Sequence, residues 1–382
     1  MTTPDKIPAE IPDEDLIEIE ASDENLDDEP ENPDLKSPFD PKEIRIIVEP
    51  KTIDHLVTRL RHDEIDLYTE FQRKGNLWKP DAQSRLIESI LLRFPLPGFY
   101  FDVDNDEKWL IVDGLQRIWT LKNFVVDESL ELNGLEILKT YSGKGITYSK
   151  LNRTMQRRIL EAPITTYLIQ PGTPKKVKYN VFRRINTGGL GLNPMEIRNA
   201  LNQGKPSKFL KDTSESTRFT EQIKVANKRM EDRELLLRAI AFINNNYREY
   251  EKPLAEFLDK TMEGLEKINS TALKKLTESI LRAIEFQNQL FGKHMFSRSI
   301  MGGDLRVRLN SALFEVWVSL TSKLNESEMN KLLANRDTLI KSYTALLKNE
   351  DFHRAISTST SGKGSVKRRF EEIAELIKKY KK

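Results

Sequence analysis

Strand-like sequence is confined to the first part of this 382-residue chain. Up to about residue 205, short β-branched or aromatic runs alternate with helical patterns, as in IRIIVEP (44–50) and ITTYLIQ (164–170). From about residue 206 onward, six segments carry apolar residues three and four positions apart, which is the spacing of an amphipathic helix. We therefore predict an α+β protein, with a small mixed sheet within residues 44–205 and an all-helical C-terminal domain within residues 206–382.

Two neighbouring strand-like runs predict a β-hairpin that leads into a helix. The runs PLPGFYFDVD (95–104) and EKWLIVD (107–113) are separated by a polar turn. Before them, PDAQSRLIESILLRF (80–94) has proline in its expected first turn, which favours an amphipathic helix. The apolar face of this helix comprises Ala82, Leu86, Ile87, Ile90, Leu91 and Phe94.

The N-terminal segment, residues 1–43, differs in composition from the remainder. Residues 1–34 contain fourteen acidic residues and one lysine, so residues 35–382 contain 60 basic and 45 acidic residues. An acidic, proline-containing segment buries too little apolar surface to offset the entropy of ordering, and it predicts a disordered tail. The basic remainder suits a polyanionic partner such as nucleic acid, although lysine-rich solvated helices produce the same charge.

Missing residue types exclude several kinds of site. The chain contains no cysteine, which excludes disulfides, thiolate catalysis and thiolate metal sites. No two of its four histidines have the spacing of zinc ligands or of a His-metal nuclease: His55, His62, His294 and His353. No apolar run approaches the roughly 18 residues of a membrane span, and the N-terminus lacks the layout of a signal peptide. We therefore expect a cytoplasmic protein without a membrane partner.

The stretch WLIVDGLQRIWTLKNF (109–124) places an acid, a glycine, an amide and a guanidinium where a strand becomes a helix. If Asp113 lies at or near the N-cap and Gly114 lets the backbone turn closely, the free amides of the first helical turn form an anion site. Arg117 would add a forked cation suited to phosphate, Gln116 a neutral donor, and Asp113 a ligand for Mg²⁺ or for a water. The structural alternative is that Asp113 only caps the helix and pairs with Arg117.

A second cluster, FQRKGNLW (71–78), precedes the amphipathic helix. It surrounds Gln72 and Arg73 with the aromatic residues Phe71 and Trp78, a pattern typical of nucleic-acid or nucleotide contacts through stacking and phosphate pairing. The alternative is that both aromatic side chains pack in the core and Arg73 forms a surface ion pair.

A third cluster is VFRRINTGGLGL (181–192), at the expected end of a helix. Asn186 precedes Thr187-Gly188-Gly189, so several backbone amides could turn inward as an anion-binding nest, with Arg183 or Arg184 nearby. The alternative is an ordinary glycine loop.

Four blocks resemble, in order and spacing, the DGQQR-motif domain family (domain of unknown function 262), which is similar to the ParB/sulfiredoxin superfamily. The blocks are FQRKGNLW, RLIESILLRFPLPGFYF, WLIVDGLQRIWTL and FRRINTGGLGL…MEIRNAL. The resemblance spans about residues 44–240 and implies a ParB/sulfiredoxin-like fold for residues 44–205. Leu115 replaces the first glutamine of the motif, whereas the other four positions match. Because leucine cannot donate a hydrogen bond to phosphate, any role of that side chain is absent here.

The resemblance implies a nucleotide-dependent, DNA-targeting protein of prokaryotic restriction or phage defence. Relatives in modification-dependent restriction systems couple a DGQQR nucleoside triphosphatase domain to a His-Asn-His nuclease domain, and no such second domain is expected in this sequence. We expect a nucleoside triphosphatase or nuclease module with Mg²⁺ and a nucleoside triphosphate as cofactors and DNA as partner. A separately encoded nuclease or methyltransferase could act with it. The alternative is a non-hydrolysing DNA-binding or modification-sensing module, which Leu115 favours.

The expected site residues come from the three clusters. The catalytic residues are Asp113, Gln116 and Arg117, with Asp113 also as metal ligand; the phosphate-binding residues are Gly114, Gln72, Arg73, Arg184, Asn186 and Gly188; the DNA contacts are Phe71, Gln72, Arg73 and Trp78. Because the acidic tail is tethered to a basic domain, it could also compete with DNA, unless it only increases solubility.

Overall fold

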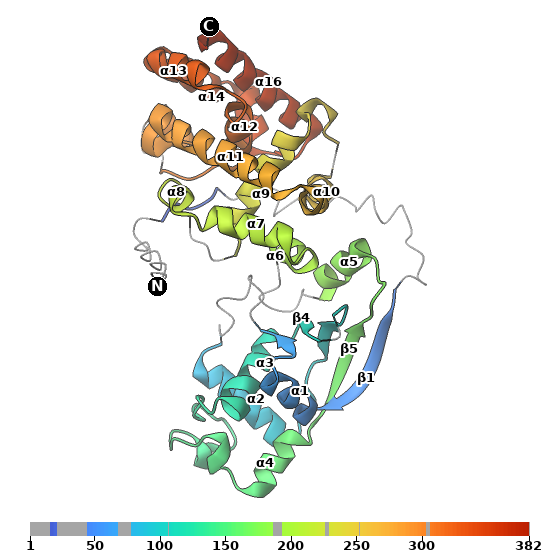
Figure 1. Cartoon of the computed structure of the whole chain (residues 1–382). Helices are drawn as coiled ribbons and strands as arrows, with labels where there is room; N and C mark the ends of the chain where they lie inside the picture. The colour runs from blue at the N-terminus through green and yellow to red at the C-terminus, as the bar shows by residue number, and fades with distance from the viewer. Residues whose placement is uncertain are drawn as a thin grey trace, which may run out of the picture. The chain divides into compact units, whose positions relative to one another are not determined.

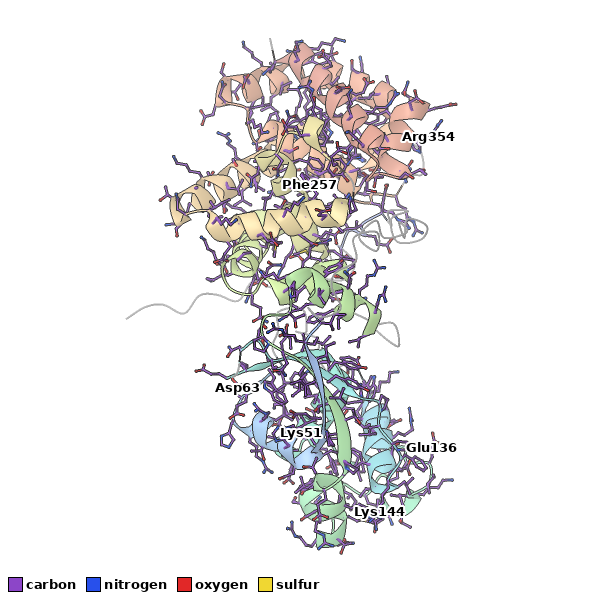
Figure 2. All side chains as sticks on the ribbon, turned by 90° about the vertical axis from the view of Figure 1, so that its right-hand side faces the viewer. Lys51, Asp63, Glu136, Lys144, Phe257 and Arg354 are labelled. Carbon is purple, nitrogen blue, oxygen red and sulfur yellow. The ribbon has the colours of Figure 1, made fainter. Side chains whose placement is uncertain are left out.

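The computed structural model contains two compact units. The α/β unit comprises Ser37–Leu201, and the helical unit comprises Met1–Lys36 together with Asn202–Lys382 (Figure 1). The residues that the structure describes are 16–20, 44–67, 78–105, 107–185, 193–225, 229–251, 253–302 and 306–381. Figure 2 shows the side chains of both units, with Asp63, Glu136 and Lys144 on the surface of the α/β unit.

Within the described residues of the α/β unit, a mixed sheet of five strands forms the centre. Its strands are β1 (Ile46–Thr52), β2 (Ile65–Asp66), β3 (Phe99–Asp102), β4 (Trp109–Asp113) and β5 (Pro163–Ile169), in the order β1-β5-β3-β4-β2. The β3–β4 pair is antiparallel, which confirms the predicted hairpin, and β3 runs parallel to β5. Strands β1 and β5 form a long antiparallel pair (Figure 1). The predicted α+β class with a small mixed sheet is therefore confirmed.

Helices cover both faces of this sheet. On one face, Phe99, Phe101 and Ile111 belong to the same apolar core as residues of four helices, α1 (Ile53–Arg61), α2 (Pro80–Leu91), α3 (Leu115–Leu121) and α4 (Arg153–Leu160). On the other face, Tyr100 and Val112 pack with α5 (Lys175–Ile185) and α6 (Pro194–Leu201). The alternation along β3 and β4 arises because successive side chains of a strand point to opposite faces.

The amphipathic helix expected at residues 80–94 is α2, which ends three residues earlier. Leu86, Ile87, Ile90 and Leu91 are buried, as predicted. Phe94 is 53% exposed, so its assignment to the apolar face is wrong. The reason is that Phe94 lies beyond the last helical residue, where the 3.6-residue period no longer determines the direction of its side chain.

The helical unit contains the helices expected in the second half of the chain. They are α7 (Lys205–Ser214), α8 (Thr217–Thr220), α9 (Glu231–Asn244), α10 (Leu254–Lys267), α11 (Ser270–Phe291), α12 (Ser311–Thr321), α13 (Glu326–Ala334), α14 (Arg336–Leu347), α15 (Glu350–Ser357) and α16 (Lys363–Tyr380). Trp317 on α12 packs edge-on against both Phe291 and Tyr343, joining α11, α12 and α14. None of the helices described has the length and apolarity needed to cross a membrane.

Residues 16–20 depart from the composition-based expectation of disorder. They form an extended segment against the helical unit, with isolated parallel bridges from Ile17 to Val225 and from Ile19 to Leu309. The prediction of disorder rested on the average composition of the acidic segment. Within it, apolar Ile17 and Ile19 alternate with Glu18 and Glu20, and this short alternation allows local strand pairing.

Candidate functional site

The strand-to-helix turn between β4 and α3 is built as the sequence suggested, with one shift. Asp113 is the last residue of β4, and the N-cap position belongs to Gly114, which has a φ of 102°. A methyl group at Gly114 would lie 2.7 Å from Cδ1 of Phe99. Glycine is therefore required here both for its left-handed backbone and for the close approach of β3.

The guanidinium of Arg117 donates hydrogen bonds to other groups of the protein. It donates hydrogen bonds to the carbonyl oxygen of Pro97, to that of Gly98 at 3.1 Å, and to Oδ2 of Asp113 at 2.9 Å. The residue is only 8% exposed, and its guanidinium lies 4.5 Å from the ring centroid of Phe99. Burial lowers the pKa of the Arg117 guanidinium, and the charge of Asp113 opposes this shift. Arg117 thus links the start of β3 to the end of β4 and fixes one oxygen of Asp113.

We predict that Gly114→Ala destabilises the α/β unit by about 2–4 kcal/mol, because alanine meets both a left-handed backbone and the ring of Phe99. Gly143→Ala is the control in the same unit, since Gly143 has a φ of 67° and the nearest atom to an added methyl group is Oδ1 of Asn133 at 3.9 Å. The control should cost only about 1–2 kcal/mol. Hydrogen exchange of peptides from the α/β unit measures both effects, and equal losses would show that the contact with Phe99 is unimportant.

Gln116 connects the second sequence cluster to this turn. Its Oε1 accepts a hydrogen bond from the backbone N–H of Trp78 at 3.1 Å. Gln83 donates to the carbonyl oxygen of Trp78 at 2.8 Å, and Asn123 donates to Gln83 at 3.1 Å. Trp78 is partly buried against the main core of the unit. The structure therefore brings together Trp78, Asp113, Gln116 and Arg117.

The described part of the third cluster, residues 181–185, belongs to α5, which packs on the other face of the sheet. Arg184 is exposed on the last turn of α5. Lys178, near the start of α5, contacts Asp102 at the end of β3, whereas Phe182 packs in the cluster that contains Val112. Helix α5 therefore runs from the end of β3 toward the end of β4. Other predicted site residues lie outside the described residues: Phe71, Gln72, Arg73, Asn186 and Gly188.

Lys178 forms a buried ion pair that the sequence did not indicate. Its Nζ lies 2.9 and 2.8 Å from the two carboxylate oxygens of Asp102 and 2.6 Å from Oδ2 of Asp104. Lys178 is 2% exposed and Asp102 is 6% exposed. Burial raises the pKa of the Asp102 carboxyl, although Lys178 opposes the shift. The partners are 76 positions apart, so no local pattern connects them.

Tyr100 is a second residue near the turn that the sequence analysis did not select. It is the register partner of Asp113 across the β3–β4 pair, and its ring stacks on Tyr167 with centroids 4.3 Å apart. Burial raises the pKa of the Tyr100 hydroxyl, with smaller contributions from Tyr167 and Asp113. The alternation in Phe-Tyr-Phe is the signal that would have set Tyr100 apart from its neighbours.

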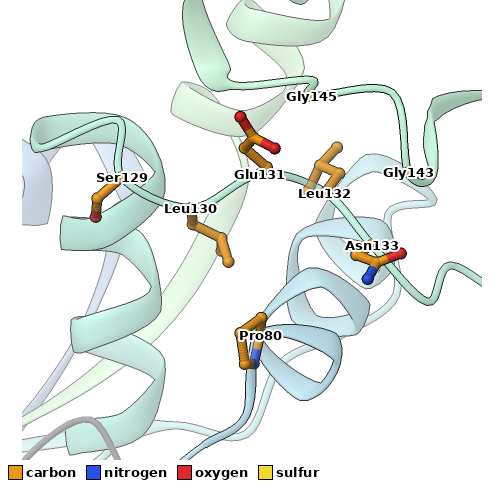
Figure 3. A pocket seen from close by; sticks show the side chains of 8 residues that line it. All are labelled: Pro80, Ser129, Leu130, Glu131, Leu132, Asn133, Gly143 and Gly145. Carbon is orange, nitrogen blue, oxygen red and sulfur yellow. The ribbon is translucent and has the colours of Figure 1, made fainter.

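A pocket of about 400 Å³ lies elsewhere in the α/β unit, between the start of α2 and the loop after α3 (Figure 3). It is lined by Pro80, Ser129, Leu130, Glu131, Leu132, Asn133, Gly143 and Gly145. Figure 3 shows the carboxylate of Glu131 and the amide of Asn133 on the same stretch of loop. Pro80 lies two residues from Trp78, so this pocket is connected along the chain to the Gln116 contact.

Metal ligands are sparse in the part of the chain that the structure describes. It holds no group of three or more histidine, aspartate or glutamate side chains placed to bind an ion. Asp113, whose side chain is 37% exposed, is the carboxylate at the β4–α3 turn. Such a donor set fits Mg²⁺ only in the mode in which one or two carboxylates act together with the phosphates of a substrate.

Comparison with known protein families relates the α/β unit to a restriction system. Residues 57–203 match the family of the GmrSD restriction endonuclease N-terminal domain. The matched residues include Trp78 and the whole β4–α3 turn, in agreement with the resemblance to DGQQR-containing proteins. No curated protein and no solved structure matches the chain.

Proposed function

We propose that this protein is a nucleotide-dependent, DNA-targeting component of a restriction or phage-defence system, with a ParB/sulfiredoxin-like α/β unit. The observation that supports this most is the family match over residues 57–203, which contains the β4–α3 turn. The net positive charge of the chain beyond its acidic tail agrees with DNA as partner.

In this proposal, the residues of the turn have separate roles. Asp113 presents the carboxylate oxygen that Arg117 leaves available, either to Mg²⁺ with a bound nucleoside triphosphate or to an attacking water. Arg117 is a positioning residue, because its donors are directed at Asp113 and at two backbone carbonyls. Gln116 couples the turn to Trp78 and so to the cluster expected to contact DNA. Arg184, on the last turn of α5, is a proposed phosphate contact, and Asn186 and Gly188 are proposed with it from the sequence alone.

Phosphate release from ATP and GTP, with Mg²⁺ and with or without DNA, tests the proposal. We expect Asp113→Asn to reduce the rate by about 10²–10³-fold while the fold is retained, because electrostatic positioning supplies most of the catalysis in such reactions. Arg157→Ala is the matched control, since Arg157 forms an exposed i,i+4 pair with Glu161. The control should leave the rate unchanged. Absence of both phosphate release and DNA nicking under all these conditions would contradict the proposal.

A second candidate is a DNA-binding or modification-sensing module without hydrolysis, acting with a separately encoded nuclease or methyltransferase. Two observations favour it: Leu115 occupies a motif position that is otherwise glutamine, and Arg117 is buried by its contacts with Pro97, Gly98 and Asp113. Binding to DNA that weakens steeply with salt, without turnover of any triphosphate, would support this candidate.

A further inference from the structure

Residues 16–20, here called the docked segment, connect two loops of the helical unit. The N–H of Ile17 donates to the carbonyl oxygen of Lys224 at 2.7 Å. The N–H of Glu20 donates to Leu309 at 2.8 Å, and the N–H of Leu309 donates back to Glu18 at 2.9 Å. The segment thus adds a short extended strand to the backbone just before α12.

The carboxylates of the docked segment meet a group of donors, here called the anion cradle. The cradle consists of Arg298, Arg308 and Asn310. Glu20 accepts from Nε of Arg298 at 2.9 Å with one oxygen and from Nδ2 of Asn310 at 2.8 Å with the other. Glu18 lies 3.2 Å from Arg308. Guanidinium and amide groups that bind a carboxylate in this way are equally suited to phosphate oxygens.

Further cationic groups adjoin the cradle. Arg298 lies 3.3 Å from Nε2 of His353. His353 also lines a pocket of about 460 Å³ together with Lys348, Arg354 and the hydroxyl-bearing residues Ser357 and Thr358. Arg354, labelled in Figure 2, is exposed on α15. An anion that bound the cradle would therefore find additional donors beside it.

We propose that the docked segment is an internal ligand that occupies a DNA-binding surface, and that the sugar-phosphate backbone of DNA displaces it from the anion cradle. The inference rests on the proposed function for the identity of DNA as ligand. Glu18 and Glu20 are alternate residues of an extended strand, so their side chains are spaced about 6.6 Å apart on one side. A row of evenly spaced anions along an extended chain is also the pattern that a nucleic-acid strand presents.

The contacts of the docked segment are suited to reversible release. Glu18 and Arg308 are 73% and 47% exposed, so solvent screens the attraction between them and their ion pair contributes little. Ile17 and Ile19 are only partly buried, and each forms an isolated bridge. Glu20 and Arg298, whose side chains are 13% and 32% exposed, form the more enclosed ion pair. Tethering to the same chain keeps the segment at a high local concentration, so these few contacts are sufficient to hold it. A longer polyanion that also reaches the neighbouring cationic groups can therefore replace it.

The absence of cysteine permits a selective covalent test in the full-length protein. Ile17 and Val225 are partners in a β-bridge, in which Cα atoms lie about 5 Å apart, a distance that a disulfide can span. We would prepare the variant I17C/V225C and measure its affinity for a fluorescent DNA duplex by anisotropy at low salt, oxidised and reduced. The parent chain, which does not respond to reductant, is the control.

We expect the disulfide to form. The oxidised variant should bind the duplex about tenfold more weakly than the reduced variant, because the cross-linked segment continues to occupy the anion cradle. Failure of the cysteines to cross-link would overturn the docking itself, whatever the protein does with DNA. Equal affinities of the cross-linked and reduced forms would overturn the inference while leaving DNA binding intact. No binding in either form would overturn the inference and DNA as the partner in the proposed function.

A matched pair of charge variants tests the same inference without a cross-link. Glu18→Gln with Glu20→Gln removes two charges from the docked segment, whereas Glu24→Gln with Glu29→Gln removes two charges from the tail beyond it. We expect the first variant to bind DNA several-fold more tightly than the parent at low salt, and the second to show a much smaller gain. Equal gains would show a general charge effect and would refute a specific contact at the cradle.

Discussion

Replacing Glu315 by glutamine is expected to destabilise the helical unit by about 3–5 kcal/mol, because it removes the buried carboxylate that Arg238 and Arg369 share. Another carboxylate beside Arg238, that of Glu234, is more distant at 3.6 Å and is itself partly exposed. Glu315 is fully buried on α12, with Arg238 of α9 2.9 Å away and Arg369 of α16 as its second partner. Both arginines are nearly as buried, at 2% and 1% exposed. Denaturant unfolding with hydrogen exchange of peptides from α9, α12 and α16 would measure the loss.

Glu278→Gln is the control for this substitution. Glu278 is 63% exposed and pairs with Arg218 at 2.7 Å, so removing its charge should change stability by about 1 kcal/mol or less. Simultaneous replacement of the three buried residues by apolar residues of similar size should recover most of the stability lost in Glu315→Gln. If Glu315→Gln unfolds at the same denaturant concentration as the parent, the three charges do not stabilise the packing of these helices.

Helix α12 connects the buried ion pairs of Glu315 to the docked segment. Asn310 caps this helix by accepting from the N–H of Leu313, and it also donates to Glu20 and to the carbonyl oxygen of Ile356. Release of the docked segment therefore removes one partner of a residue at the start of the helix that carries Glu315. Because Asn310 keeps its contacts with Leu313 and Ile356, release is expected to leave the helical packing intact.

Periodicity was sufficient to locate most elements of both units. The predicted hairpin, the strand ITTYLIQ and the long amphipathic helices are present because each depends on patterns within a few residues. The two-residue strand β2 was not anticipated, since Ile65 and Asp66 carry too short a pattern to distinguish from a loop. The order of the strands is likewise a property of pairing between distant segments.

The candidate site was located from the sequence, whereas its internal contacts were not. The composition of the turn, Asp113-Gly114 followed by Arg117, indicated a close strand-to-helix connection. The i,i+4 pair between Asp113 and Arg117, which was the structural alternative to a phosphate contact, is present. The carbonyl oxygens of Pro97 and Gly98, which accept from Arg117, lie 20 and 19 positions away, just before β3. The sequence pattern assigned this guanidinium to phosphate, whereas the structure directs it at tertiary contacts that no local pattern contains.

Lys178→Met is expected to destabilise the α/β unit by about 3–5 kcal/mol at neutral pH, since it leaves the buried carboxylate of Asp102 without its cation. Lys108→Met is the control in the same unit, because Lys108 pairs with Asp63 at 3.0 Å and the two side chains are 35% and 71% exposed. The control should cost about 1 kcal/mol or less. Denaturant unfolding followed by the hydrogen exchange of α5 and β3 distinguishes the two variants.

The loss in Lys178→Met should also depend on pH in a direction fixed by Asp102. Burial raises the pKa of this carboxyl in the folded protein, so the folded state binds a proton more tightly than the unfolded state does. The stability gained by protonation is complete below the unfolded pKa of about 3.9 and is lost as pH rises through the folded value. Without Lys178 the folded pKa rises further, because the charge that opposed the shift is absent.

The loss of stability in Lys178→Met, relative to the parent, should therefore be smaller at pH 4.5 than at pH 7.5. At the lower pH the buried Asp102 carboxylate can take up a proton, so no unpaired charge remains buried. Lys108→Met should show no comparable change, since Asp63 remains in water with or without its partner. Adding Asp102→Asn to Lys178→Met removes the titrating group and should abolish the pH dependence. A loss in Lys178→Met that is the same at both pH values would mean that packing of the lysine side chain, and not the charge of Asp102, determines its contribution.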